Sequence, residues 1–252
     1  MKYSEDFTVR SYEVDERKYL YPWTVMRYLQ EAADHQMRDE DVEYSKLLFE
    51  KHIAFVVSRI SIEIYGAPHK YSTIRSRSWT IPGHGANFPR GYDLYKGDEL
   101  LAKALSSWAL VDTENGKLIR YKDYDMSGYS SDAEPELEIP HRFKLPNPES
   151  FEKVAEQTVL PSWCDINHHI NNTVYSRILY DMIPNVQDEI ITSMNIYYKH
   201  EAKLGKDFVV YRSPRMSAEG LDPRADEVIC FYTESEGKTN VQAVFGLKKP
   251  KK

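Results

Sequence analysis

Residues 163–175 hold side chains that could carry out acyl chemistry. Asp165, Asn167 and His169 stand at every second position, directly before a helix-like sequence. Because residues two apart in an extended segment point to the same side, we expect a carboxylate, an amide and an imidazole to face one patch. Such a set can bind a carbonyl group, move a proton and stabilise the oxyanion that forms when the carbonyl is attacked.

The same loop ends in Asn171 and Asn172, immediately before the predicted helix. Asparagine is a favoured helix N-cap, and free amides at a helix N-terminus favour negative charge. A simpler interpretation is a capped helix entrance, in which the histidine is solvated or bonded to the backbone. The loop residues by themselves leave both interpretations open.

The composition favours a globular chain rich in β-sheet. Hydrophobic residues make up 41% and charged residues 29%, a balance that permits a proper core. The 19 tyrosines and 4 tryptophans fit pleated, half-buried surfaces. A net charge of −6 disfavours a nucleic-acid binder, which normally relies on many contacts from Lys and Arg to phosphates.

Membrane and targeting signals are not evident in the sequence. No apolar run approaches the ~20 residues needed to cross a bilayer, so we predict no membrane span. Residues 1–6 lack the apolar core of a secretory signal. The two cysteines, Cys164 and Cys230, have no metal-ligand spacing, so we predict a reducing cytoplasm, no metal and no cofactor. A single disulfide between them stays open.

The sequence contains an internal repeat, in which the same order of predicted elements occurs twice. Strand-like residues 7–10 and 12–15 precede a helix predicted over 22–38 from Pro22 and the 3–4 spacing of Trp23, Met26, Leu29 and Ala33. Residues 157–160, a polar loop at 165–172 and a helix at 173–182 open the second half. The strands predicted after the two helices are 54–65, 71–81, 88–95 and 100–112, and then 189–200, 207–213, 227–234 and 239–248.

The repeat is weak in sequence. Residues 24–29 align with 173–178 at an offset of 149, whereas Asp15 aligns with Asp165 at 150, which predicts an insertion or deletion between them. Residues 127–150 carry four prolines and a run rich in Ser and acidic residues, typical of an exposed, extended connector. We therefore predict an N-terminal domain over 1–126, a linker over 127–150 and a C-terminal domain over 151–252, each domain a sheet wrapped on one helix.

Two segments of the chain resemble those of a known enzyme family. The pattern Asp-x-Asn-x-His-x-Asn-Asn-x-x-Tyr at 165–175 resembles the active-site segment of the acyl-acyl carrier protein (acyl-ACP) thioesterases of plants and bacteria. The run Tyr-Tyr-Lys-His-Glu at 197–201 resembles the strand end where that family places an acidic catalytic residue, here Glu201. The resemblance covers the whole chain in length and order. It implies an α+β double hotdog, two tandem helix-wrapped antiparallel sheets packed together.

The resemblance also implies an activity and a division of labour. The second domain would hydrolyse fatty acyl-ACP, releasing free fatty acid and terminating fatty acid synthesis. Its catalytic residues would be Asp165, Asn167, His169 and Glu201. Glu201 would activate a water molecule or attack the thioester directly, and both routes stay open. Plant members have a cysteine after the acidic residue, but this chain has Ala202, so a cysteine nucleophile is disfavoured.

The first domain would shape the acyl-chain pocket. The candidate lining residues are Trp23, Met26, Leu29, Phe55 and Val57, although each could equally belong to the domain core. Acyl carrier protein is acidic, so docking would need a basic surface. The candidate basic residues, which could also form an ordinary solvated face, are Lys199, His200, Lys203, Lys206, Arg212 and Arg215.

The motif is compatible with two other functions. An acyl-CoA thioesterase and a non-catalytic acyl-binding hotdog protein are the alternatives, while the spacing of the polar residues disfavours a hotdog dehydratase. Acyl-chain length, saturation and branching depend on a few core substitutions that the motif does not reveal. A monomer and a homodimer are both compatible with tandem hotdogs.

Overall fold

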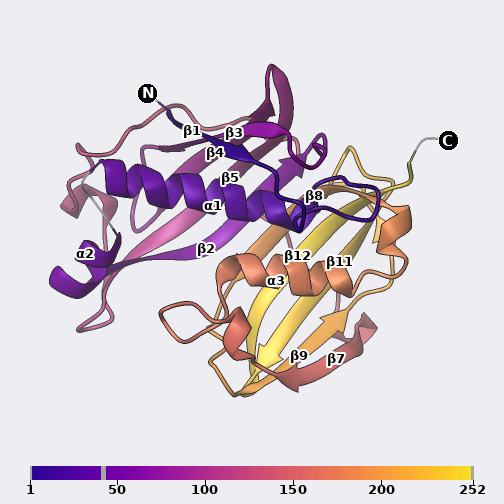
Figure 1. The fold of residues 1–252 in the computed structure, drawn as a ribbon. Coiled ribbons are helices and arrows are strands. Elements are labelled where there is room, and N and C mark those ends of the chain that lie inside the picture. Colours follow the sequence, from indigo (N-terminus) through magenta and orange to yellow (C-terminus); the bar gives the residue numbers. More distant parts are fainter. Residues whose placement is uncertain (1, 41–43, 251–252) are drawn as a thin grey trace. The chain divides into compact units, whose positions relative to one another are not determined.

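The computed structural model describes residues 2–40 and 44–250, and the chain divides into two compact units. The first unit contains residues 1–59 and 64–137, and the second contains 60–63 and 138–252. The change from one unit to the other at 137/138 falls inside the segment predicted as a linker. Each unit consists of one long helix and an antiparallel sheet (Figure 1).

The first unit carries the longer helix. Its elements are β1 (Tyr3–Thr8), α1 (Pro22–Asp39), α2 (Tyr44–Glu50), β2 (Ile53–Ile64), β3 (Thr73–Thr80), β4 (Phe88–Lys96), β5 (Glu99–Asp112), β6 (Leu118–Ile119) and η1 (Tyr121–Asp123). Residues 60–63 of β2 are assigned to the second unit. Strands β1, β3, β4, β5 and β2 lie in that order.

The second unit repeats this arrangement with a shorter helix. Its elements are η2 (Pro148–Ser150), β7 (Glu152–Thr158), η3 (Pro161–Trp163), α3 (Asn172–Asp181), η4 (Val186–Asp188), β8 (Ile190–Tyr198), β9 (Asp207–Arg212), β10 (Met216–Ser217), β11 (Glu227–Ser235) and β12 (Lys238–Lys248). Strands β7, β9, β11, β12 and β8 lie in that order. Matching β1 with β7 and β2 with β8 makes the two strand orders identical, so the doubled pattern predicted from the sequence is confirmed.

The repeat runs at one offset through the start of the helix. Helix α1 begins at Pro22 and α3 at Asn172, which are 150 residues apart, as are the bridge pairs Val14–Leu20 and Cys164–Ile170. The insertion or deletion predicted from the offset of 149 is therefore wrong. Comparison of residue types gave an offset of 149 because the buried faces of both helices carry apolar residues, and apolar residues also match when one helix is shifted by one position.

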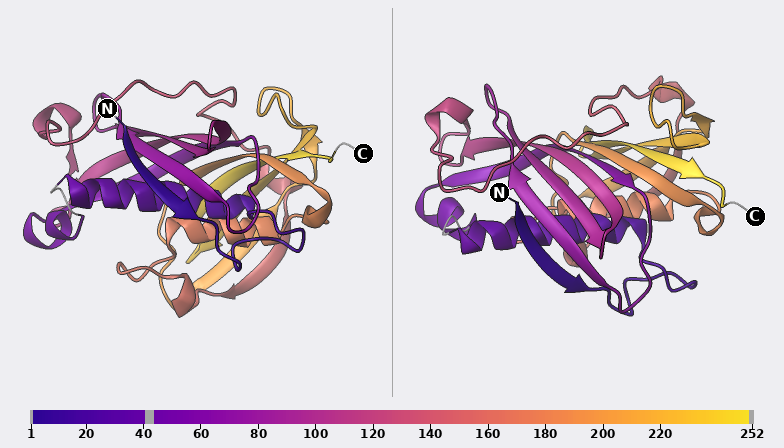
Figure 2. Two further views of the ribbon diagram at one scale, coloured as in Figure 1. Left: turned by 45° about the horizontal axis from the view of Figure 1, so that its top comes forward. Right: turned by 90° about the horizontal axis from the view of Figure 1, so that it is seen from above.

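Each helix packs one face on the sheet of its own unit. Helix α1 lies along the sheet of the first unit (Figure 2). Trp23, Met26 and Leu29 are buried on α1, and the Ser76 hydroxyl of β3 donates to the carbonyl of Tyr28 at 3.1 Å. Helix α3 starts as predicted, because the Asn171 side chain accepts the backbone N–H of Thr173 at 2.9 Å. No helix in residues 2–40 and 44–250 is long and apolar enough to cross a membrane.

Three sequence expectations need correction. Residues 12–15 form a turn and an isolated bridge instead of a strand, because the chain reverses there. Helix α2 was not predicted. Residues 127–150 have no helix or strand apart from the short η2, as expected, but Tyr129, Ile139 and Phe143 are buried. The composition of that segment is polar on average, whereas its few apolar side chains are enough to anchor it to the units.

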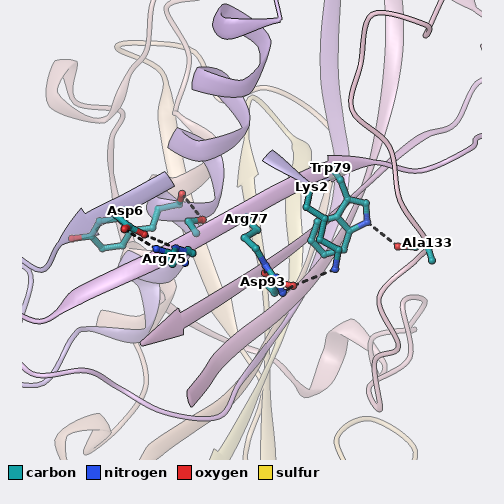
Figure 3. Close-up of polar contacts among 9 residues, drawn as sticks. Lys2, Asp6, Arg75, Arg77, Trp79, Asp93 and Ala133 are labelled. Atoms are coloured by element: carbon teal, nitrogen blue, oxygen red, sulfur yellow. Dashed lines mark hydrogen bonds and ion pairs between the residues drawn. The ribbon is translucent and has the colours of Figure 1, made fainter. Parts of the chain in front are cut away.

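Ion pairs attach the edge strand β1 to its sheet in the first unit (Figure 3). Arg75 of β3 donates to both carboxylate oxygens of Asp6, at 2.7 and 3.0 Å. The ammonium group of Lys2 lies 3.7 Å from the ring centre of Trp79 and 3.5 Å from Asp93. The indole N–H of Trp79 donates to the carbonyl of Ala133 at 2.8 Å, which ties the segment after η1 to the same sheet.

Candidate active site

The loop before α3 is a tight hairpin. The N–H of His168 donates to the carbonyl of Asp165 at 3.0 Å, and the N–H of Asp165 donates to the carbonyl of His169 at 3.1 Å. The Asp165 carboxylate accepts the N–H of Asn167 at 2.9 Å, and His168 has a left-handed φ of 61°. These are the features of a three-residue hairpin loop over 166–168 that is closed by Asp165 and His169, with an Asx turn formed by Asp165.

The extended segment predicted here is therefore wrong, although two of its three side chains do converge. Because the chain reverses, Asp165 and His169 face each other across the mouth of the hairpin, with Oδ1 and Nδ1 3.9 Å apart. Asn167 is exposed at the tip, and its side chain has no hydrogen bond to residues 2–40 and 44–250. The structure brings the acid and the imidazole together; the predicted contact of the Asn167 amide with the substrate carbonyl stays a prediction.

The predicted fourth residue, Glu201, approaches the other side of the imidazole. It lies in the loop after β8, and its Oε1 is 3.7 Å from Nε2 of His169. Both carboxylate contacts of His169 are longer than a hydrogen bond, which is common for catalytic groups in the absence of substrate. The carbonyl of Ile170 lies 3.4 Å from Nδ1, so the acceptors beside Nδ1 favour a proton there and leave Nε2 facing Glu201.

The backbone of the second loop is joined to the hairpin. The N–H of Ile170 donates to the carbonyl of Ala202 at 3.0 Å, and the N–H of Leu204 donates to the carbonyl of His168 at 3.0 Å. These two bonds enclose the bridge between His169 and Lys203. They explain how residues 32 positions apart in the sequence, His169 and Glu201, come to share one site.

The site residues are only partly shielded from solvent. The side chains of His169 and Asp165 are 20% and 21% exposed, and that of Glu201 is 59% exposed. A reacting group can therefore reach the imidazole and the glutamate from outside. His168 is exposed at the turn and contributes to the hairpin through its backbone N–H and carbonyl.

Comparison with known proteins identifies the family. The model of the acyl-ACP thioesterase N-terminal domain matches residues 1–129, and that of the C-terminal domain matches residues 149–245. The chain belongs to the acyl-ACP thioesterase family. The matched ranges lie on either side of a gap at 130–148, within the segment predicted as the linker.

The chain is similar in sequence to plant thioesterases. The chain is 22% identical over 236 residues to a chloroplastic palmitoyl-acyl carrier protein thioesterase of Cuphea hookeriana, covering 86% of this chain and 55% of the relative. It is 27% identical over 199 residues to oleoyl-acyl carrier protein thioesterase 2 of Arabidopsis thaliana, covering 72% and 54%. The chain thus spans about half the length of these acyl-ACP thioesterases.

Solved acyl-ACP thioesterase structures share the fold. One from Bacteroides thetaiotaomicron superposes with a TM-score of 0.83 at 20% identity, covering 98% of both chains. The 12:0-ACP thioesterase of Umbellularia californica gives 0.76 at 16% identity, covering 99% of this chain and 98% of that chain. The predicted α+β double hotdog is confirmed.

Neither cysteine is placed to act as a nucleophile. Both are free, and the Cys164 thiol donates to the carbonyl of Leu160 at 3.5 Å instead of facing His169. Burial, and then the neighbouring Asp165, raise the pKa of Cys164, while burial raises the pKa of Cys230 to about 11. A raised pKa keeps a thiol in its unreactive protonated form near neutral pH.

The predicted basic surface is smaller than expected. Arg212 pairs with Glu152, Arg215 with Glu189 and Glu227, and Lys206 with Glu236. These three cations mainly serve contacts within the unit. The remaining members of the predicted set, Lys199, His200 and Lys203, are exposed in the loop that carries Glu201.

The predicted pocket residues belong to the first unit. Trp23, Met26, Leu29 and Val57 are buried, and Phe55 is half-buried against Phe88 at a ring-centre distance of 5.7 Å. These contacts make them core residues of α1 and β2. Their part in lining an acyl pocket stays a prediction.

Two residues of the site were missed as site residues. The hydroxyl of the buried Tyr175 on α3 lies beside the backbone N–H of Ala202, and burial raises the pKa of Tyr175. The amide of Asn240 on β12 donates to the carbonyl of Glu201 at 3.2 Å. Tyr175 already stood in the recognised motif. Asn240 had no signal beyond being a polar residue in an apolar strand.

Proposed function

We propose that this chain hydrolyses fatty acyl-ACP, releasing free fatty acid and so ending chain elongation. The observation that carries the proposal is the placement of His169 between two carboxylates, 3.9 Å from Asp165 and 3.7 Å from Glu201. Membership of the acyl-ACP thioesterase family supports the substrate class. The thiol of phosphopantetheine is a good leaving group, with a pKa near ~8.5, so the site need not protonate it early.

In the water route, Glu201 takes a proton from a water molecule whose oxygen bonds to the thioester carbonyl carbon. The C–S bond then breaks, the carboxylic acid is released, and the thiolate receives the proton held by Glu201 and Nε2 of His169. Asp165 keeps the proton of His169 on Nδ1, so that Nε2 stays available. Asn167 is proposed to bind the carbonyl oxygen once substrate is present.

In the direct route, a carboxylate oxygen of Glu201 bonds to the carbonyl carbon and displaces the thiolate. Water then hydrolyses the resulting mixed anhydride and regenerates Glu201. The two routes differ in one observable. Rapid acid quench followed by intact-protein mass spectrometry detects the added acyl mass only in the direct route.

We also propose that the carrier protein docks beside the Glu201 loop. Lys199, His200 and Lys203 are exposed there and could meet the acidic surface of the carrier. The proposed setting is the cytoplasm, where the free cysteines Cys164 and Cys230 would stay reduced. Fractionation of cells that express the protein would test the location.

The test of the function is thiol release measured on matched substrates. One acyl chain is presented on carrier protein and on CoA, and free thiol and free acid are measured for wild type, Glu201→Ala and His168→Asn. We expect carrier-protein turnover to exceed CoA turnover, to disappear in Glu201→Ala and to persist in His168→Asn, whose asparagine tolerates the left-handed backbone. Faster turnover of acyl-CoA would assign the alternative substrate, and tight binding without thiol release would make the protein a non-catalytic acyl binder.

A further inference from the structure

The carboxylate of Glu201 has little to hold it in place. Its side chain is 59% exposed. Its Oε1 lies 3.7 Å from Nε2 of His169, a distance longer than a hydrogen bond. A displacement of about 1 Å in a catalytic group can cost roughly 100-fold in rate. The position of Glu201 must therefore come from its backbone.

Three elements bind the backbone around Glu201. The Asn240 amide of β12 donates to the carbonyl of Glu201 at 3.2 Å and, more weakly, to that of His200 at 3.4 Å. Tyr175 of α3 lies beside the N–H of Ala202, and the carbonyl of Ala202 accepts the N–H of Ile170 from the hairpin at 3.0 Å. Of these partners, only Asn240 contacts the carbonyl of Glu201.

Asn240 is an unusual residue for its position. Its side chain is fully buried, and its Oδ1 has no hydrogen-bond partner in the part of the chain that the structure describes. A buried acceptor without a partner destabilises the fold. The amide half of the side chain is used while the carbonyl half is left unsatisfied, so the residue is poorly explained by stability.

The first unit has Leu101 at the position that corresponds to Asn240. The N–H groups of Lys199 and His200 donate to the carbonyl of Asn240 at 2.7 and 3.2 Å. In the first unit, Tyr65 and Gly66 donate in the same way to the carbonyl of Leu101, at 2.8 and 3.3 Å.

Leu101 is 1% exposed and apolar. Counting on from these bonds by the same register places Ala67 where the second unit has Glu201. Asn240 therefore occurs in the second unit, which has Glu201, whereas Leu101 occurs in the first unit, which has Ala67 in place of that glutamate.

We infer that Asn240 is a positioning residue that holds the Glu201 peptide so that its carboxylate meets His169. The inference rests on the proposed role of Glu201. It predicts that Asn240 affects the rate of the chemical step through Glu201. It also predicts that an apolar side chain at this position would make the folded protein equally stable or more stable.

The decisive variant is Asn240→Leu, which installs the residue of the first unit. We expect the melting temperature to be unchanged or higher, kcat to fall roughly 10- to 100-fold, and KM to change less than about threefold. His200 carries a Cβ where Gly66 has none, so Leu could be crowded there. Asn240→Ala is therefore made in parallel, with the same kcat loss expected. The control is Leu101→Asn, the reciprocal change, which should lower the melting temperature and leave kcat of the folded protein unchanged.

A second measurement tests whether Asn240 acts through Glu201. Adding Asn240→Ala to Glu201→Ala should cause no further loss of kcat, because the positioned group is already missing. Full kcat in folded Asn240→Ala, or a full additional loss in the double variant, would overturn the inference while leaving the role of Glu201 intact. Wild-type kcat in Glu201→Ala would overturn the proposed function, and the inference with it.

Discussion

The chain builds the same hairpin twice, and the proposed catalytic residues lie on the second copy. In the first unit the N–H of Asp15 donates to Tyr19 at 2.8 Å and that of Lys18 to Asp15 at 2.9 Å, as in the second unit at positions 150 higher. Lys18 has a φ of 71°, like the 61° of His168. The backbone of the hairpin is thus independent of catalysis.

The two hairpins have the same backbone but differ in the side chains at the positions of the proposed site. Asp15 matches Asp165, and its carboxylate accepts the N–H of Tyr19 at 3.0 Å and pairs with Arg17. In the first unit the aspartate thus makes contacts within the hairpin alone, which a role in forming the turn would explain. What distinguishes the second unit is His169 in place of Tyr19 and Glu201 in place of Ala67.

The largest effect is expected from giving the second unit the alanine of the first. Glu201→Ala should lower kcat by about 1000-fold or more, because it removes the base or nucleophile. The melting temperature should change little, since the side chain is 59% exposed. Steady-state thiol release and a thermal melt measure the two quantities.

The reciprocal change controls for this result. Ala67→Glu, combined with Glu201→Ala, should not restore activity, because Tyr19 lies where the imidazole would be needed. Restored turnover would show that the first hairpin can also carry the reaction, and the contrast between the units would fail.

The second prediction exchanges the ring residue. His169→Tyr installs the counterpart of Tyr19, which the same backbone already accommodates. We expect kcat to fall roughly 100- to 1000-fold, because a tyrosine near neutral pH cannot exchange a proton as histidine does. Circular dichroism should stay that of the wild type. A variant that keeps more than a tenth of the wild-type kcat would argue against a proton role for His169.

The third prediction separates turn formation from catalysis. Asp15→Ala and Asp165→Ala should each destabilise the protein by about 1 kcal/mol, since each removes a carboxylate that accepts a backbone N–H. Only Asp165→Ala should also lower kcat, by about tenfold, through poorer orientation of His169. Chemical denaturation and turnover are compared side by side. Equal activity in the two variants would reduce Asp165 to a turn residue.

The smallest effect is expected at the cysteines. Cys164→Ala should keep kcat within about twofold, because the thiol faces the carbonyl of Leu160. The pKa of Cys230 is raised to about 11, above the ordinary ~8.5, so its thiolate is scarce below pH 11 and becomes abundant only above it. Alkylation of Cys230 by iodoacetamide should therefore be slow at pH 8 and accelerate as the pH rises. Rapid loss of activity on alkylation at pH 8 would implicate a thiol.

Much of the fold could be predicted because its signals are local. Strand-like runs predicted β2 to β5 and β8 to β12 to within one or two residues, apart from the short β10, and Pro22 and Asn171 placed the helix starts. The strands predicted at 7–10 and 157–160 overlap only the last two residues of β1 and β7. The short helix α2 was missed because seven residues give too little periodicity to be recognised. The buried residues of 127–150 were missed because composition averages over them.

The candidate site was predicted in its residues but not in its geometry. Alternation suggested that Asp165, Asn167 and His169 share one side, whereas the Asx turn places Asn167 at an exposed tip. Side-chain direction depends on backbone dihedrals, and a single left-handed residue, His168, reverses the chain. Nothing local in the sequence distinguishes that turn from an extended segment.

By itself, the sequence determined which side chains are available, the order of the elements and the duplication, because these depend on residue type and periodicity. Only the tertiary structure decided that Glu201 meets His169, that Asn240 holds the Glu201 backbone, and that Arg212 and Arg215 are used by internal ion pairs. These contacts join residues far apart in the chain. Strand pairing between β8 and β12 brings Asn240 to Glu201, the hairpin brings His169 there, and pairing between β7 and β9 brings Arg212 to Glu152, none of which a local pattern encodes.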